Sequence, residues 1–294
     1  MHISKERQGE MFILGETALW GLFPIISILT FSTLSPLTTA GLSTIVASIF
    51  FGTILTIRRG WRQLAVRGIW RDILWITLLI GIMYYTLLFI GLYHTTAGNA
   101  SIMAEMEVFF SMFILHVWNK EKATIQLVLG AILMILGATI ILFQGTLRLD
   151  LGSGIILLAT LFPPMANYFQ KRVRTKINSE AILFCRSVLS GIFLLTLAWV
   201  FDGMPTMHAI TASSTFLLIN GIFLMGLSKI FWIEGIHRMS IGKSISLSPI
   251  TPAFTLLFAF LFLHDVPTIW QLSGFVPIIF GVHILTKKIH SSRL

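Results

Sequence analysis

The sequence predicts an all-α membrane protein with ten transmembrane helices, and three observations lead to this prediction. Hydrophobic residues make up 55% of the 294 residues and charged residues only 11%, with a mean hydropathy of +0.87. A soluble domain would carry roughly a quarter charged residues. The apolar residues form runs of about 20, the length of a helix that crosses a bilayer. Finally, Lys and Arg are alternately frequent and rare in successive connections between these runs.

Uncharged runs place the helices. Between residues 17 and 57, for example, no Asp, Glu, Lys or Arg occurs, so this run accommodates two crossings with a turn at the Ser, Thr and Pro residues of 32–36. A transmembrane β-barrel would show alternating segments of about ten residues, which are absent from the sequence. We expect helices near residues 11–31, 36–57, 73–93, 96–117, 124–143, 153–170, 181–201, 214–236, 241–262 and 267–286.

The distribution of positive charge tests this count independently. If the N-terminus is inside, the cytoplasmic connections hold nearly all of the 21 Lys and Arg residues, including the cluster within 58–71. The opposite side holds Arg148 alone, while Arg186 and Lys229 fall inside predicted helices. The positive-inside rule therefore predicts that both termini are cytoplasmic. It also accounts for the net charge of +9 without a nucleic-acid partner, because basic loops bind the anionic inner leaflet.

The two halves of the chain, residues 1–150 and 151–294, resemble each other at an offset of 144 residues. With five helices in each half, the second copy must be inverted relative to the first, which is a common architecture of transporters. Chance similarity between glycine-rich apolar helices is the alternative interpretation. The offset pairs Gly91 with Gly235, Gly98 with Gly242, Phe110 with Phe254, Glu121 with Asp265, Thr124 with Thr268, Gly130 with Gly274, and Gly137 with Gly281.

Several short motifs resemble the drug/metabolite transporter superfamily, and specifically its ten-helix EamA-type branch. The first motif is the sequence LWG that ends at Gly21 and is followed by Phe23 and Pro24. The second is the stretch 93–107, which leads into the fourth helix, and the third is Cys185-Arg186 in the seventh helix. Val108 departs from the family pattern, which usually has proline there. The resemblance implies transport of amino acids, drugs, nucleotides, sugars or other metabolites, often as export.

Charged side chains at membrane depth cost about 2.5–3.5 kcal/mol each, so each one needs a reason. Glu105 and Glu107 are about 200° apart around a regular helix, so we expect only one of them to face a central cavity. That carboxyl group could bind a substrate ammonium or a proton. Alternatively, it forms a structural ion pair with Lys229 or Arg186.

The remaining intramembrane charges also have two interpretations each. Lys229 could bind an anionic substrate or neutralise a glutamate of the fourth helix. Arg186 could bind substrate or extend to the cytoplasmic face. Glu16 could line the cavity or lie in a frayed helix end. Aromatic and polar residues that could complete the cavity are Trp20, Tyr84, Tyr85, Asn99, Asn167, Tyr168 and Trp232.

Other classes of protein lack support in the sequence. No H-E-x-x-H, G-x-S-x-G or Walker A motif occurs, and the four Asp residues fall in predicted connections, so we expect neither an enzyme nor an ATP-driven pump. The single cysteine, Cys185, and the His spacing predict no metal site and no cofactor.

The function predicted is a secondary transporter of the inner membrane that exports small metabolites such as amino acids or drug-like compounds by alternating access. The alternatives are an uptake or exchange carrier for an anionic or nucleotide-like metabolite, or a lipid flippase. The expected partners are a small-molecule substrate, the lipid bilayer and a counter-transported proton or solute, but no nucleic acid. The expected state is a monomer or a homodimer.

Overall fold

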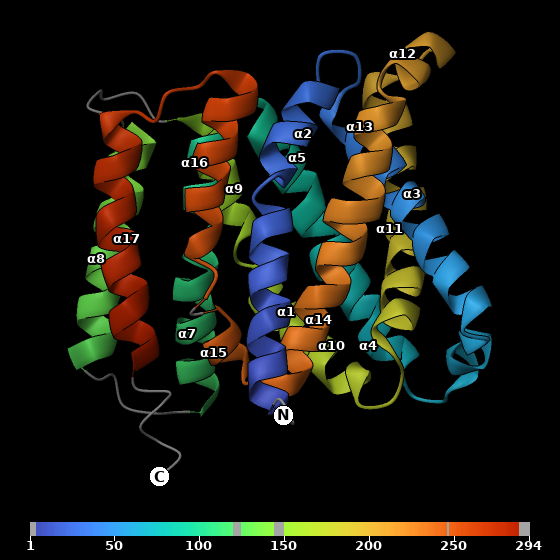
Figure 1. The fold of residues 1–294 in the computed structure, drawn as a ribbon, viewed down its shortest axis with the longest axis horizontal. Coiled ribbons are helices and arrows are strands. Elements are labelled where there is room, and N and C mark those ends of the chain that lie inside the picture. Colours follow the sequence, from blue (N-terminus) through green and yellow to red (C-terminus); the bar gives the residue numbers. More distant parts are fainter. Residues whose placement is uncertain (1–3, 120–124, 144–149, 246, 288–294) are drawn as a thin grey trace.

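A computed structural model describes residues 4–119, 125–143, 150–245 and 247–287, and over these residues it contains helices and no strands (Figure 1). Glu121, Thr124 and Arg148, which entered the sequence analysis, lie outside the described residues. The described helices form ten passes at the predicted positions, so the predicted all-α architecture is confirmed. Six passes are long and apolar enough to cross a membrane individually, and three shorter apolar helices lie within the fifth, ninth and tenth passes.

The first half of the chain forms passes one to five. A short 3₁₀ helix, η1 (Gly60–Ala65), lies in the connection between the second and third passes. The passes are, in order, α1 (Lys5–Trp20) with α2 (Phe23–Thr30); α3 (Pro36–Ile57); α4 (Trp70–Ile76) with the π-helical segment η2 (Thr77–Tyr84) and α5 (Tyr85–Tyr93); α6 (Ala97–Ala104) with α7 (Met106–Asn119); and α8 (Ile125–Phe143).

The second half repeats this order in passes six to ten. A short helix, α12 (Met207–Ala212), precedes the eighth pass. The passes are α9 (Leu151–Ala159) with α10 (Pro163–Arg174); α11 (Ser179–Asp202); α13 (Ser214–Leu218) with the π-helical segment η3 (Ile219–Leu227) and α14 (Ser228–Arg238); α15 (Ile241–Ile245) with α16 (Ile250–Leu263); and α17 (Ile269–Lys287).

The first pass begins earlier than predicted, at Lys5 rather than near residue 11. Ser4 caps the helix by accepting a hydrogen bond from the backbone N–H of Arg7 at 3.2 Å. The added turns also have a tertiary partner, because the Lys243 ammonium donates to Glu6 at 2.6 Å and to Glu10 at 2.5 Å. Capping and ion pairing therefore extend a helix whose first turns are too polar for a hydropathy pattern to reveal.

Corresponding passes of the two halves run in opposite directions. In Figure 1, α1 starts at the lower end of the bundle and α2 lies above it, whereas α9 lies high and α10 at the lower end. The fourth pass descends from α6 to α7, and the ninth ascends from α15 to α16. The second repeat is thus inverted relative to the first, as the odd number of passes predicts.

Packing between the halves follows the same pseudo-twofold relation. Helix α3 packs against its counterpart α11, and α8 packs against its counterpart α17. The α8–α17 contact depends on the glycines that the 144-residue offset aligns. A Cβ atom on Gly137 would collide with the carbonyl oxygen of Gly274, and one on Gly281 would lie 2.7 Å from the carbonyl oxygen of Gly130. The two contacts are reciprocal, as twofold symmetry requires.

Helix interruptions also occur in corresponding passes. The first pass breaks between Trp20 and Phe23 ahead of Pro24, and the sixth breaks ahead of Pro163 and Pro164. The third and eighth passes each contain a π-helical segment. The fourth and ninth passes break as well, between α6 and α7 and between α15 and α16. Such interruptions tend to occur at functional sites in membrane proteins.

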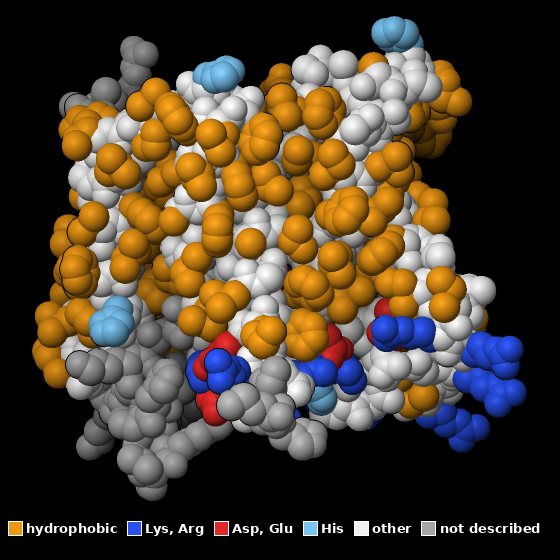
Figure 2. Space-filling view, viewed as in Figure 1, with side chains coloured by type: hydrophobic (Ala, Val, Ile, Leu, Met, Phe, Trp, Pro, Cys, Tyr) orange, Lys and Arg blue, Asp and Glu red, His pale blue; other side chains and the backbone are white. Residues whose placement is uncertain are grey.

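The surface is consistent with a membrane-spanning protein. Hydrophobic side chains cover most of the visible face, and the described Lys and Arg residues on this face gather at its lower end (Figure 2). The exposed arginines from the end of α3 to the first turn of α4 belong to the connection predicted to be cytoplasmic; they are Arg58, Arg59, Arg62, Arg67 and Arg71. Helix α1 begins, and α17 ends, at this same end of the bundle (Figure 1).

Candidate functional site

A cavity lies between the two repeats and receives side chains from passes one, three, four, six, seven, eight and nine. Its empty volume is about 830 Å³, which includes space open to the outside. The lining residues are Glu16, Trp20, Pro24, Ile80, Tyr84, Tyr85, Ser101, Ala104, Glu105, Glu107, Val108, Pro163, Asn167, Gln170, Arg186, Lys229, Trp232, Ser248 and Thr251.

Most of the candidate residues from the sequence come together in this cavity. Asn99 and Tyr168 do not line it; the other candidates do, and they are Glu16, Trp20, Tyr84, Tyr85, Glu105, Glu107, Asn167, Arg186, Lys229 and Trp232. Charge at membrane depth was the main signal that selected them. Their convergence on one cavity makes it the candidate substrate site.

Glu16 and Lys229 form an ion pair that joins the first pass to the eighth. The Lys229 ammonium donates to a Glu16 carboxylate oxygen at 2.8 Å, and both side chains are largely buried. The same ammonium lies 3.3 Å from the centroid of the Trp20 ring, and Trp20 in turn stacks on Phe23. The ion-pair partner of Lys229 is therefore Glu16 and not a glutamate of the fourth helix. The interpretation of Glu16 as part of a frayed end is wrong.

Glu105 and Glu107 both line the cavity, which corrects the expectation that only one of them would. Glu105 stands at the break between α6 and α7, where the backbone forms hydrogen bonds from Glu105 to Ile102 and from Val108 to Glu105. These are three-residue bonds of the 3₁₀ type, which wind the chain more tightly than an α-helix. The tighter turn brings two carboxyl groups that are two residues apart toward the same space.

Both of these carboxyl groups have neutral hydrogen-bond partners from the second repeat. Ser248 donates to Glu105 at 2.8 Å, and the Asn167 amide donates to Glu107 at 3.0 Å. Asn167 is itself held in place, because its carbonyl oxygen accepts hydrogen bonds from Trp232 and from Gln170, each at 2.9 Å. Neither carboxylate forms an ion pair with a Lys or Arg among the described residues.

Arg186 is buried deep in the seventh pass, with 2% of its surface exposed. Its guanidinium lies 5.5 Å from the centroid of the Tyr85 ring and donates to the Tyr85 hydroxyl at 3.3 Å. Its Nε atom has no hydrogen-bond partner in the part of the chain that the structure describes. Gly81 lets the third pass approach the seventh closely one turn further along, since a Cβ there would lie 2.6 Å from Ser190 Cβ. The expectation that Arg186 extends to the cytoplasmic face is wrong.

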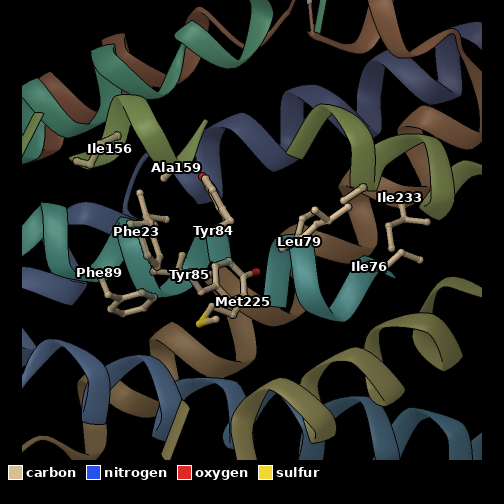
Figure 3. Close-up of a cluster of buried hydrophobic side chains, with 14 of the residues drawn as sticks. Phe23, Ile76, Leu79, Tyr84, Tyr85, Phe89, Ile156, Ala159, Met225 and Ile233 are labelled. Carbon is tan, nitrogen blue, oxygen red and sulfur yellow. The ribbon is translucent and has the colours of Figure 1, made fainter. Parts of the chain in front are cut away.

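The apolar part of the cavity wall comes from the third pass and its neighbours. Figure 3 shows Tyr84 and Tyr85 among the buried side chains Phe23, Phe89 and Met225. The two tyrosine rings are 5.7 Å apart, and the Tyr85 ring meets the edge of Phe89 at 6.5 Å. These rings fix the position of the Tyr85 hydroxyl that contacts Arg186.

Asn99 and Tyr168 have other surroundings. The Asn99 amide donates to Asp150 at 3.1 Å, and its carbonyl oxygen accepts from Gln271 at 2.9 Å, in a polar cluster at the opposite end of the fourth pass from the basic face. Tyr168 is 45% exposed and stacks with Arg172, whose guanidinium carbon is 5.6 Å from the ring centroid. Ser248 and Gln170, by contrast, line the cavity without having been candidates.

The described residues contain no group of three His, Cys, Asp or Glu that could hold a metal ion. The chemistry that the cavity offers is therefore that of its side chains: carboxylates, an ammonium, a guanidinium, amides, hydroxyls and aromatic rings.

Comparison with known proteins decides the family. The model of the EamA-like transporter family matches the chain twice, over residues 7–143 and 151–287. The chain belongs to the EamA-like transporter family. Its members are transporters rather than enzymes, and this chain is accordingly a multi-pass membrane transporter with a small-molecule substrate, located in bacteria in the inner membrane. The predicted resemblance is confirmed.

Several relatives support this assignment at low identity. An uncharacterized transporter of Bacillus subtilis, YoaV, is 23% identical over 93% of this chain and 95% of its own length. An uncharacterized transporter of Methanothermobacter thermautotrophicus is 26% identical over 94% and 85%. A probable terminal-alkyne amino-acid exporter of Streptantibioticus cattleyicolor is 26% identical over 70% and 69%. A crystal structure that is 14% identical superposes with a TM-score of 0.70 over 97% of this chain and 99% of its own, which shows the same fold.

Proposed function

We propose that this EamA-family member is a secondary transporter that exports small metabolites, such as amino acids or drug-like compounds, by alternating access. The observation that carries the proposal is the cavity between two inverted repeats, which has both signs of charge and aromatic rings in its wall. Exchange of conformation between two inverted halves would open such a cavity to each side of the membrane in turn.

The composition of the wall favours a solute that is partly charged and partly apolar. Trp20, Tyr84, Tyr85 and Trp232 offer aromatic surface, while Arg186 and the two glutamates of the fourth pass offer charge. An amino acid or an amphipathic drug combines these features. The relative from Streptantibioticus cattleyicolor is named as an exporter of an amino acid, which agrees with this class at low identity.

The driving force that fits the cavity is a proton or solute gradient. The cavity wall contains three acidic and two basic side chains: the acids are Glu16, Glu105 and Glu107, and the bases are Arg186 and Lys229. Because Glu16 and Lys229 neutralise each other, the remaining groups have one more acid than base. An unpaired carboxyl in a wet intramembrane cavity can exchange a proton during the transport cycle.

Counterflow in proteoliposomes tests the proposal. Purified protein would be reconstituted in vesicles that contain an excess of an unlabelled compound, and accumulation of the labelled compound would be followed for the twenty amino acids and a set of cationic drugs. We expect accumulation of at least one compound above empty vesicles, and resistance to that compound when the protein is produced in a sensitive host. Absence of counterflow for the whole panel would refute the proposal.

Export also requires the orientation that the positive-inside rule predicts. In a Cys185→Ala background, a cysteine at Thr33 or Asp265 should react in intact cells with a membrane-impermeant maleimide, whereas a cysteine at Arg62 should react only after the membrane is opened. The reverse pattern would show that the basic face is external.

A further inference from the structure

The buried charges of the described residues fall into two groups. Four of the six have a partner of opposite charge: Glu16 with Lys229, Asp72 with Arg172, Glu180 with Arg58, and Glu234 with Arg174. The other two, Glu105 and Arg186, have no ion-pair partner among the described residues, and both line the cavity. The unpaired charges are thus located at the candidate substrate site.

Arg186 is the less satisfied of the two. A guanidinium carries five N–H donors and no acceptor, and it remains charged in proteins. Within the described residues the guanidinium contacts only neutral groups, the hydroxyl and the ring of Tyr85, and its Nε atom has no hydrogen-bond partner. Burial of a charge without a counter-ion is unfavourable, which is why buried charges are ordinarily paired. An anionic group that enters the cavity would supply the counter-ion that Arg186 lacks among the described residues.

Lys229 does not compete for that anion. Its ammonium is already paired with Glu16 and lies over the Trp20 ring. Among the described residues, Glu105 and Glu107 accept hydrogen bonds only from the neutral groups of Ser248 and Asn167. The cavity therefore presents to a solute one guanidinium and two carboxyl groups that have no ion-pair partner among the described residues.

We infer that Arg186 binds the carboxylate of a zwitterionic amino acid, whose ammonium group is held by Glu105 or Glu107 and whose apolar side chain contacts the aromatic wall. The inference rests on the proposed transport function and names its substrate class. The planar fork of a guanidinium matches a carboxylate through two parallel hydrogen bonds. A cation that lacks a carboxylate would leave Arg186 unpaired and would be repelled by it. A dianion would be repelled by the two glutamates.

A ligand series on the unaltered protein gives the first test. The four probes are L-phenylalanine, its amide, 2-phenylethylamine and 3-phenylpropionate, which separate the two charged groups of the zwitterion. The other amino acids and their amides would be tested in the same way, by binding in nanodiscs and by counterflow. Loss of the carboxylate should weaken binding by roughly ten- to a hundredfold, the range expected for a charged hydrogen-bonded group. Loss of the ammonium should also weaken it.

Variants then locate the carboxylate site. Arg186→Gln should remove the discrimination between an amino acid and its amide, because it weakens the binding of the acid and no longer repels the cationic amide. Arg186→Lys should retain part of the discrimination, because it keeps the charge but loses the planar fork. Arg172→Gln is the matched control, since Arg172 also stacks on a tyrosine but lies outside the cavity. It should bind both compounds like the unaltered protein.

The outcomes separate this inference from the proposed function. If amides and simple amines are bound and transported as well as the parent acids, or if Arg186→Gln still discriminates, the carboxylate site is refuted while the transporter remains. If no compound of the panel is transported or bound, both fail. Should Arg186→Gln not fold, the ligand series on the unaltered protein and on Arg186→Lys still decides the question.

Discussion

The Glu16–Lys229 pair and Arg186 are parts of the same cavity wall, but they differ in whether the protein supplies a counter-ion for the buried charge. Lys229 has a carboxylate at 2.8 Å and an aromatic ring beneath its ammonium. Arg186, which is buried more completely, has only Tyr85 as the partner of its guanidinium among the described residues. The first arrangement is complete within the protein, and the second becomes complete only with a ligand.

This difference indicates how stability and binding are divided among similar residues. A paired charge that loses its partner becomes an isolated buried charge, so its removal should act on folding. An unpaired charge does not stabilise the fold in this way, so its removal should change the binding of the solute and leave the free energy of unfolding nearly unaltered. The loss in free energy of unfolding should therefore decrease in the order Glu16→Gln, Asp72→Asn, Glu105→Gln.

Breaking the paired arrangement should have the largest effect. We expect Glu16→Gln to lower the free energy of unfolding by about 3–5 kcal/mol, because it leaves the Lys229 ammonium buried without a counter-ion. The measurement is thermal or denaturant-induced unfolding of purified protein in detergent or nanodiscs.

The double variant Glu16→Gln with Lys229→Met serves as the control for this prediction, since it removes both charges together. It should regain most of the lost stability. A single variant as stable as the unaltered protein, or a double variant as unstable as the single one, would show that the pair does not stabilise the fold.

Loss of an ion pair that lies nearer to the surface should lower the free energy of unfolding by less. Arg172 donates from Nε to Asp72 at 2.7 Å, but 36% of the Arg172 side chain is exposed. When Asp72 is replaced by asparagine, Arg172 can turn to water instead of remaining buried. We expect Asp72→Asn to cost about 1 kcal/mol, measured by the same unfolding assay. A loss as large as that of Glu16→Gln would show that exposure does not moderate the effect.

The unpaired carboxylate should show the smallest effect on stability. In Glu105→Gln the side-chain amide can still accept the hydrogen bond from Ser248, and a buried charge without a counter-ion is removed. We expect a change within about 1 kcal/mol, together with a loss of transport or an altered dependence of transport on external pH. A strongly destabilised variant, or a stable one with unaltered transport and pH dependence, would contradict the assignment of Glu105 to the solute.

Hydropathy and charge suffice to predict most of this architecture. The ten passes follow from apolar runs of bilayer length, and the inverted repeat follows from an odd number of passes together with a constant offset. The same reasoning selects Glu16, Lys229 and Arg186, because charge at membrane depth is rare enough to be informative. The aligned pairs Gly130 with Gly274 and Gly137 with Gly281 mark where α8 and α17 approach most closely.

Other features depend on three-dimensional detail that no local pattern encodes. The break at Glu105 could not be predicted from a proline, because Val108 occupies the position where the family usually has one. Without the break, Glu105 and Glu107 would point in different directions. Which acid neutralises Lys229 depends on the rotation of the first pass against the eighth. Tyr168 carries the same chemistry as Tyr85, but the face of its helix turns it outward.

The π-helical segment η3 has a consequence for helix phase. A π-helix winds one residue more into each turn than an α-helix does, so the two ends of the eighth pass are rotated relative to an unbroken α-helix. On one side of the segment's centre, Asn220 donates to Ser27 at 3.1 Å; just beyond its end, Lys229 reaches Glu16. Deletion of one residue from the segment would re-phase these ends by about 100°. The extra residue therefore lets the eighth pass contact the first pass twice, with a polar side chain each time.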